Sequence, residues 1–247
     1  MFRFYILCAA LVFLAPQSWG QENKKSDVSA YYEVTSQIER KLPPAYAHLA
    51  SQLPTSNTTG LFLRYDGNQA LSDTGPAADS DDRTATSDGM HVRTTGAKRS
   101  VYVDVDGGAV TKQVHFMDRQ FLISSDAPEI EWRLTQEVAE FLGYPAFKAT
   151  ATVDGKSVEA WFTPDIAAPV GPDTYGGLPG LILVLTEDGG RRTFVAQEVS
   201  TAPLEEAIQP PTEGRRMTSE EYRSLVQEKM EQIRSDRQAG TVIIPGN

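Results

Sequence analysis

Cysteine and histidine are scarce in this sequence. The 247 residues contain one cysteine, Cys8, and three histidines, His48, His91 and His115. A lone cysteine excludes an internal disulfide, and the histidines lack the close spacing of paired zinc ligands. The chain also has no Gly-x-Ser-x-Gly nucleophile motif and no phosphate-binding loop. From the sequence we therefore expect no metal site and no cofactor.

Positive charge is also in short supply. The chain has 23 Lys and Arg against 33 Asp and Glu, for a formal net charge of −10. An acidic surface repels nucleic acid and anionic lipid, so we expect no nucleic-acid partner. The charge favours solubility and does not by itself indicate a site.

Long apolar runs are missing apart from one near the N-terminus. Tyr5 to Ala15 is an apolar segment after Arg3, and Ser18 and Gly20 are small residues suited to signal-peptidase cleavage. A spanning helix needs roughly 20 apolar residues, which this segment does not reach. We therefore predict that residues 1–20 are a signal peptide and that residues 21–247 are exported as one β-rich domain that is not transmembrane. The periplasm, the outer-membrane periphery and the extracellular space remain open.

Alternating apolar residues and short turn signals predict a mainly β fold. Val28 to Val34 alternates as a half-buried strand does, and Asp106-Gly107 and Asp154-Gly155 are two-residue hairpin signals. We expect about ten strands, among them residues 61–65, 101–105, 110–116, 120–124, 131–135, 148–153, 156–162 and 192–199. Short hairpins between them predict an antiparallel meander that forms a curled sheet or a partly open barrel.

The most buried strand is expected at Leu181 to Leu185. These five consecutive apolar residues predict a strand that is covered on both faces. Pro179 and Gly180 precede it, and we expect a type II turn there with positive φ at Gly180.

One helix is predicted with clear boundaries. Thr218 and Glu221 form a capping box at its start, and Tyr222, Leu225 and Val226 begin an apolar stripe that continues to Ile233. We expect this helix at residues 218–239, packed on the sheet or across a barrel mouth; a free helix that binds a partner is the alternative. Residues 45–53 have short helical spacing, and residues 136–142 fit a helical turn or a strand.

An acidic segment interrupts the strands. Residues 73–89 are rich in Asp, Ser, Thr, Gly and Pro and nearly devoid of apolar side chains. This composition predicts a mobile loop. Its carboxylates lack the ligand order and closing Glu of a calcium loop.

Several short elements follow one another in a fixed order over about 70 residues in the second half of the chain. They are Trp132, Gly143, Tyr144, Lys148, Ala149, Trp161, Pro164, Gly171, Pro172, Gly177, Leu178, Pro179, Gly180, Leu181 and Ile182. With these residues the chain resembles the GLPGLI family of small exported proteins, typical of Bacteroidetes-type bacteria. Many members of that family carry a cysteine where this chain has Pro145-Ala146-Phe147. The family implies export and a β-rich fold, with no established activity.

Three functions fit these observations. We favour an exported, non-enzymatic binding or accessory protein of the cell envelope, with an apolar ligand or an envelope protein as its partner. The alternative is a secreted glycan-acting hydrolase that uses Glu159 or Asp165 near Trp161, since paired carboxylates cleave glycosides. The third is a purely structural envelope protein. Trp132, Trp161, Tyr144 and Phe147 could stack on sugar or line a cavity, but core packing is the favoured role.

Overall fold

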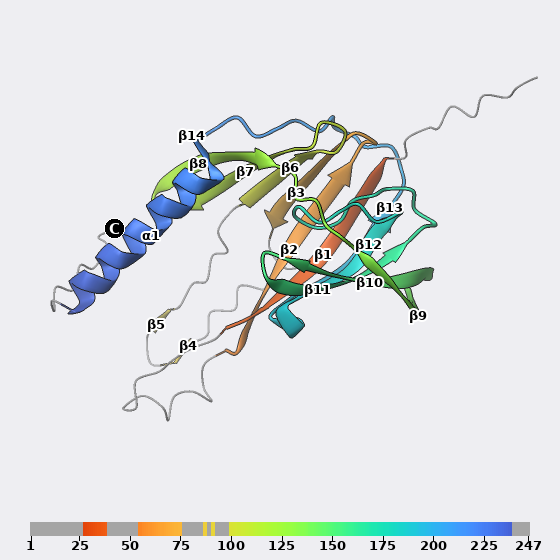
Figure 1. Cartoon of the computed structure of the whole chain (residues 1–247), viewed down its shortest axis with the longest axis horizontal. Coiled ribbons are helices and arrows are strands. Elements are labelled where there is room, and N and C mark those ends of the chain that lie inside the picture. The colour runs from red at the N-terminus through yellow and green to blue at the C-terminus, as the bar shows by residue number, and fades with distance from the viewer. Residues whose placement is uncertain (1–26, 39–53, 76–85, 88–89, 92–98, 239–247) are drawn as a thin grey trace, which may run out of the picture.

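In its described part the structure, a computed structural model, is dominated by one large β-sheet with one long helix at one end (Figure 1). It describes residues 27–38, 54–75, 86–87, 90–91 and 99–238. The helix expected at residues 45–53 lies outside these ranges. Of the acidic segment at residues 73–89, Asp73 to Gly75 continue a strand, and residues 76–85 and 88–89 are outside the described part.

The main sheet has twelve strands in the order β14-β8-β7-β6-β3-β2-β1-β13-β12-β11-β10-β9. Every pair is antiparallel except β14 with β8. The strands are β1 (Val28–Gln37), β2 (Ser56–Tyr65), β3 (Gln69–Gly75), β6 (Arg99–Asp104), β7 (Ala109–Phe116), β8 (Arg119–Asp126), β9 (Arg133–Phe141), β10 (Tyr144–Val153), β11 (Lys156–Thr163), β12 (Leu181–Glu187), β13 (Arg192–Ser200) and β14 (Arg215–Thr218). A separate small pair is formed by β4 (Thr86–Ser87) and β5 (Met90–His91).

The predicted mainly β, antiparallel class is confirmed, and the sheet is curled and open. Its outer strands, β14 and β9, do not pair with each other, so the sheet does not close into a barrel. Figure 1 shows β9, β10 and β11 at a steep angle to β2 and β3. The ambiguous residues 136–142 lie largely in strand β9, which begins at Arg133 and so excludes Trp132.

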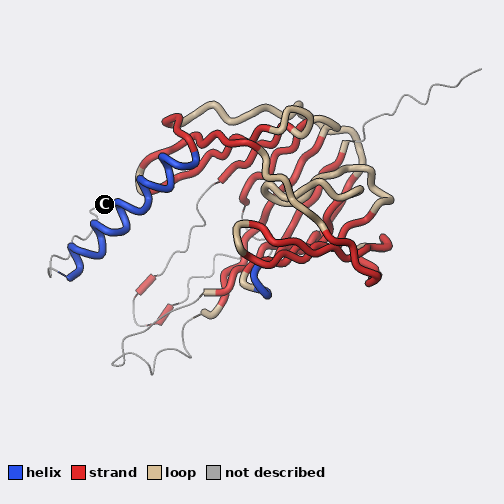
Figure 2. The backbone as a smooth tube through the Cα atoms, viewed as in Figure 1, coloured by secondary structure: helices blue, strands red, loops and turns tan. Residues whose placement is uncertain are grey.

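Two strands of the main sheet were not predicted, β3 and β14. The last four residues of β3 are Ser72, Asp73, Thr74 and Gly75, a composition that is typical of a loop. β14 has four residues, two of them Arg, and pairs in parallel with β8 after a long connection. Residues 201–214 form this connection, which runs along one margin of the sheet in Figure 2.

The core lies on one face of the long central strands. Val28, Ala30, Tyr32 and Val34 alternate along β1, are buried, and face buried side chains of β2 and β13. The Tyr32 hydroxyl donates a hydrogen bond of 2.6 Å to the carbonyl oxygen of Ile182. Burial raises the pKa of Tyr32, so this hydroxyl keeps its proton and can act as the donor.

Strand β12 is buried on both faces, as the apolar run predicted. Leu181, Ile182, Leu183 and Leu185 are each 0% exposed. The second cover comes from the connection between β11 and β12, residues 164–180, in which Ile166, Ala168, Val170 and Leu178 are buried. We call this connection the cover loop.

The turn before β12 differs from the one expected. The Gly180 amide donates to the carbonyl oxygen of Leu178 at 2.8 Å, which closes a three-residue turn over Pro179. The type II turn expected there is therefore wrong. Gly180 does have a positive φ, +152°, and a Cβ on it would overlap the carbonyl oxygen of Thr163.

The helix α1 (Ser219–Gln238) begins at the predicted capping box. The Thr218 amide donates to the Glu221 carboxylate at 2.7 Å, and the Glu221 amide donates to the Thr218 hydroxyl at 3.2 Å. These hydrogen bonds lower the pKa of Glu221. The helix contacts β8 and β14 at the end of the sheet, far along it from β12, so the helix expected to cover the sheet covers only this end. Within the described ranges, no helix combines the length and apolar composition needed to cross a membrane.

Candidate ligand-binding groove

A groove of about 570 Å³ lies between α1 and the strands at its end of the sheet. We call it the α1 groove. Small-molecule sites usually occupy about 300–1,000 Å³. The side chains that line it are Arg99, Lys112, Val114, His115, Ile123, Ser219, Tyr222, Arg223, Val226 and Gln227.

Strand register and helical spacing bring these side chains together. Lys112 of β7 pairs directly with Ile123 of β8, so their side chains share a face of the sheet. On α1 the lining residues follow one another at positions i, i+3, i+4, i+7 and i+8, which is one helical face. This face is offset from the apolar stripe, and it therefore brings Arg223 and Gln227 toward the sheet.

Aromatic contacts fix the start of the helix. The Tyr222 ring lies 5.7 Å from the ring of Phe121 and 6.2 Å from that of Phe116, measured between centroids. The later turns of α1 are less covered, and Met230 is 50% exposed. The groove therefore lies at the N-terminal end of α1, where Tyr222 packs against the sheet.

The groove concentrates positive charge on an acidic chain. Arg99, Lys112 and Arg223 line it. Among the described residues, Lys112 and Arg223 make no ion pair. Burial lowers the pKa of Lys112 and Arg99 lowers it further, while the carboxylates of Asp173 and Asp154 oppose this shift. The charged ammonium is therefore under-compensated, and an anion in the groove would stabilise it.

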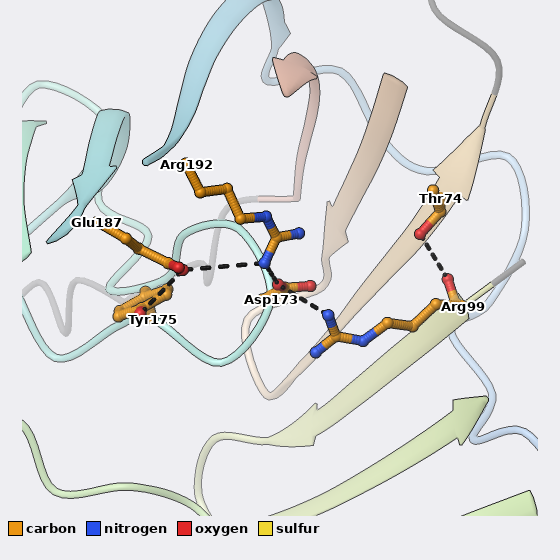
Figure 3. Close-up of polar contacts among 6 residues, drawn as sticks. All are labelled: Thr74, Arg99, Asp173, Tyr175, Glu187 and Arg192. Carbon is orange, nitrogen blue, oxygen red and sulfur yellow. Dashed lines mark hydrogen bonds and ion pairs between the residues drawn. The ribbon is translucent and has the colours of Figure 1, made fainter. Parts of the chain in front are cut away.

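Arg99 is held in place by Asp173 of the cover loop (Figure 3). The Asp173 side chain is 7% exposed, and its Oδ2 lies 3.3 Å from Nη1 of Arg99 and 2.9 Å from Nη1 of Arg192. The Thr74 hydroxyl donates to the Arg99 carbonyl oxygen at 3.1 Å. One carboxylate thus joins the cover loop to both the groove and β13.

The same network continues away from the groove. Nη1 of Arg192 lies 3.8 Å from Oε1 of Glu187, and the Tyr175 hydroxyl donates to that oxygen at 3.0 Å (Figure 3). Burial and the neighbouring Glu187 carboxylate raise the pKa of Tyr175. The Arg192 guanidinium also lies 4.3 Å from the centroid of the Phe194 ring. These contacts satisfy the buried charges locally and indicate a structural role for this part of the network.

A second concavity of about 370 Å³ is lined by Ser29 of β1, Arg64 of β2, Ser200 of β13 and the adjoining residues 202–206. Its cation, Arg64, is 3.0 Å from Asp73 and 4.0 Å from Glu206. These carboxylates compensate the charge of Arg64, so this concavity lacks the uncompensated positive charge of the α1 groove.

The residues of the GLPGLI resemblance build the cover loop and the strands under it. The indole Nε1 of Trp132 donates to the Gly176 carbonyl oxygen at 2.9 Å. Gly171 leaves no room for a side chain, because a Cβ there would lie 2.8 Å from Ile182. Leu178, Leu181 and Ile182 are buried, as are Ala149, Pro172 and Gly180, while Gly143, Pro164, Gly177 and Pro179 are exposed in turns. The motif therefore lies mostly in the packing of β12.

The carboxylates singled out by the sequence do not form a cleft pair. Nζ of Lys148 lies 3.1 Å from Glu159 and 3.2 Å from Glu137, and both carboxylates are more than half exposed. These two contacts raise the pKa of Lys148. Asp165 lies beyond the end of β11, and the five residues from Glu159 to Thr163 already span about 13 Å of strand.

The aromatic residues singled out with them divide into two groups. Trp132, Tyr144 and Trp161 pack against the core, and Trp161 also meets Phe141 edge-on at 5.6 Å. Phe147 is partly exposed on the β10 surface. Core packing, the favoured role, therefore holds for three of the four.

Sequence reasoning missed the α1 groove. A signal was present. Lys112 lies between Val110 and Val114 on one side of β7, and Arg99 lies two residues before Val101 on one side of β6, so both cations take positions that face inward. Cations at inward-facing strand positions are unusual unless they have a partner. The position of α1, however, could not be read from the sequence.

Comparison with known proteins finds a family model that matches part of the chain and solved structures with a similar fold. A family model described as "Protein of unknown function (Porph_ging)" matches residues 152–184, which include Trp161 and the segment from Gly177 to Ile182. No curated protein matches the chain. Two solved structures of PNGF-II, in the P21 and C2 space groups, are similar at TM-scores of 0.53 and 0.54 and 14% identity. In both, 82% of this chain aligns with 33% of the PNGF-II chain, and the likeness is one of fold.

Proposed function

We propose that this chain is an exported, non-enzymatic binding or accessory protein of the cell envelope, with the α1 groove as its ligand site. The observation that carries the proposal is the groove itself, which places Arg99, Arg223 and the under-compensated Lys112 beside apolar side chains. Ligand sites commonly combine an apolar lining with a few polar groups that orient the ligand.

Membership of the GLPGLI family and export are parts of this proposal. The family-model match at residues 152–184 supports the first, because it falls on the motif that carries the resemblance. The sequence of residues 1–20 supports the second. Protein isolated from its native envelope should have the intact mass of residues 21–247, with Gln21 as its first residue. A mass that includes residues 1–20 would contradict export with cleavage.

Native mass spectrometry of protein purified from its own envelope tests the binding role. We expect a co-purifying mass on the wild type that is lost in Val226→Trp, whose larger side chain fills the groove. Met230→Trp is the matched control, because it adds the same indole to an exposed position on the same helix. Retention of the mass by Val226→Trp, or no bound mass on the wild type, would refute the groove as the ligand site.

The hydrolase remains the second candidate because Glu137 and Glu159 flank one lysine beside Trp161. Each carboxylate is engaged by the same ammonium on an open strand surface, and this arrangement favours an ion-pair role. We therefore expect no turnover of a glycan panel by the wild type. Turnover that is lost in Glu159→Gln or Asp165→Asn, with folding intact, would establish the hydrolase instead.

A further inference from the structure

We infer that the α1 groove binds an anionic amphiphile, a small molecule with one acidic head group and an apolar tail. This inference rests on the proposed function, because it names the ligand class of the same groove. The observation behind the inference is that the residues lining the groove fall into two groups, one cationic and one apolar.

The cationic group would hold the acidic head. Arg99 gives one of its five N–H donors to Asp173, so other donors stay available to a ligand. Lys112 is half-buried and, among the described residues, has no carboxylate at ion-pair distance. Arg223 reaches the same groove from α1. A carboxylate or phosphate here would make charge-assisted hydrogen bonds that a neutral ligand cannot make.

The apolar group would hold the tail. Val114 and Ile123 supply the floor from β7 and β8, and Tyr222 and Val226 supply the wall from α1. Ile123 is buried, whereas Val114, Tyr222 and Val226 are partly exposed and would bury more apolar surface when a tail is bound. Each methylene of the tail that leaves water would add to the affinity through the hydrophobic effect.

Other ligand classes fit this lining less well. A small cation would be repelled by the positive charges of Arg99, Lys112 and Arg223. A nucleic acid would reach the groove only past a chain of net charge −10. A single acidic head group carries far fewer charges than a nucleic acid and is repelled less. The positive charges of the groove oppose the repulsion that remains.

Titration calorimetry with the full chain and defined probes tests the ligand class. We use laurate and dodecyl phosphate as anionic amphiphiles, 1-dodecanol as the neutral counterpart, and acetate and inorganic phosphate as heads without tails. We expect at least one of the two anionic amphiphiles to bind about tenfold or more tightly than 1-dodecanol and than its own tail-less head. The comparison of laurate with dodecyl phosphate identifies the head group.

Charge-removing variants test the position of the head. Lys112→Met keeps a long unbranched side chain without the charge and should weaken the tighter anionic probe about tenfold, as expected for loss of a charge-assisted hydrogen bond. Arg223→Gln is the second variant, at an exposed helical position where folding is not at risk. Arg216→Gln, an exposed arginine of β14 outside the groove, is the matched control and should leave the affinity unchanged.

The outcomes separate this inference from the proposed function. If 1-dodecanol binds as tightly as laurate and dodecyl phosphate, and Val226→Trp abolishes its binding, the groove is a ligand site but the anionic class is wrong. If Lys112→Met, Arg223→Gln and Arg216→Gln weaken the anionic probes equally, the specific role of the groove cations is refuted. If no probe binds while a mass still co-purifies with the wild type and not with Val226→Trp, the amphiphile is wrong and the proposed function stands. If no mass co-purifies either, both fail.

Discussion

Two regions of the sheet are built in opposite ways. At β12, the cover loop closes over the strand so completely that Leu181, Ile182 and Leu183 have no exposed surface. At α1, the helix is held by Tyr222 at its start, and a groove remains between it and β6–β8. The first region is filled by its own chain, and the second is filled only in part.

This difference separates framework from site. A packed interior leaves no room for a ligand, and its charged groups, such as Asp173, are paired within the chain. A groove with cations at inward-facing positions leaves positive charge and N–H donors available to bind another molecule. Asp173 connects the two regions, because it belongs to the cover loop and holds Arg99 of the groove.

The largest effect is expected at Gly180. In Gly180→Val, the side chain would overlap the Thr163 carbonyl oxygen at a backbone φ of +152°. We expect a loss of at least about 4 kcal/mol in the free energy of unfolding, enough to remove folded protein. Expression and denaturant melts measure this. The control is Gly177→Ala, at a φ of +82° that strains any side chain but where the Cβ would meet nothing within 4 Å. Equal damage from both would show that the close approach to Thr163 is unimportant.

The next effect concerns burial of β12 on both faces. Ile182→Ala and Leu183→Ala should each lose about 2–5 kcal/mol, because both side chains are fully buried and point in opposite directions from the strand. Urea unfolding of the two variants gives the comparison. If one of them costs less than about 0.5 kcal/mol, as an exposed site does, that face of β12 is not covered.

A smaller effect is expected where the two regions are joined. Asp173→Asn keeps the shape of the side chain but removes the charge that pairs with Arg99 and Arg192. We expect a loss of about 2 kcal/mol in the free energy of unfolding. The matched control is Asp73→Asn, a carboxylate that is 35% exposed, pairs with Arg64 and should cost under about 1 kcal/mol. Equal losses in thermal or urea unfolding would mean that Asp173 does not join the two regions.

The smallest effect is expected at the helix cap. Thr218→Ala removes the hydroxyl that accepts from the Glu221 amide, and should cost about 1 kcal/mol. Circular dichroism during urea unfolding measures the loss, and Thr218→Ser, which restores the hydroxyl, should recover most of it. No loss in Thr218→Ala would show that the aromatic contacts of Tyr222 alone define the start of α1.

Local signals in the sequence predicted much of this fold. The hairpin at Asp154-Gly155, the apolar run of β12 and the capping box at Thr218 each depend on neighbouring residues, and each is found in the structure. β14 could not be predicted, because its pairing with β8 joins segments about 90 residues apart and its own residues carry no strand pattern. The α1 groove is invisible in the sequence for a similar reason, since it depends on where α1 rests on the sheet.

An NMR titration of the labelled chain with the tighter of the two anionic amphiphiles tests the central claim most directly. The account predicts amide shift changes that concentrate on β6–β8 and on the first two turns of α1, while the amides of the cover loop and β12 stay largely unchanged. Shift changes that concentrate on the cover loop and β12, or that spread evenly over the sheet, would contradict the division between a filled framework and an open site.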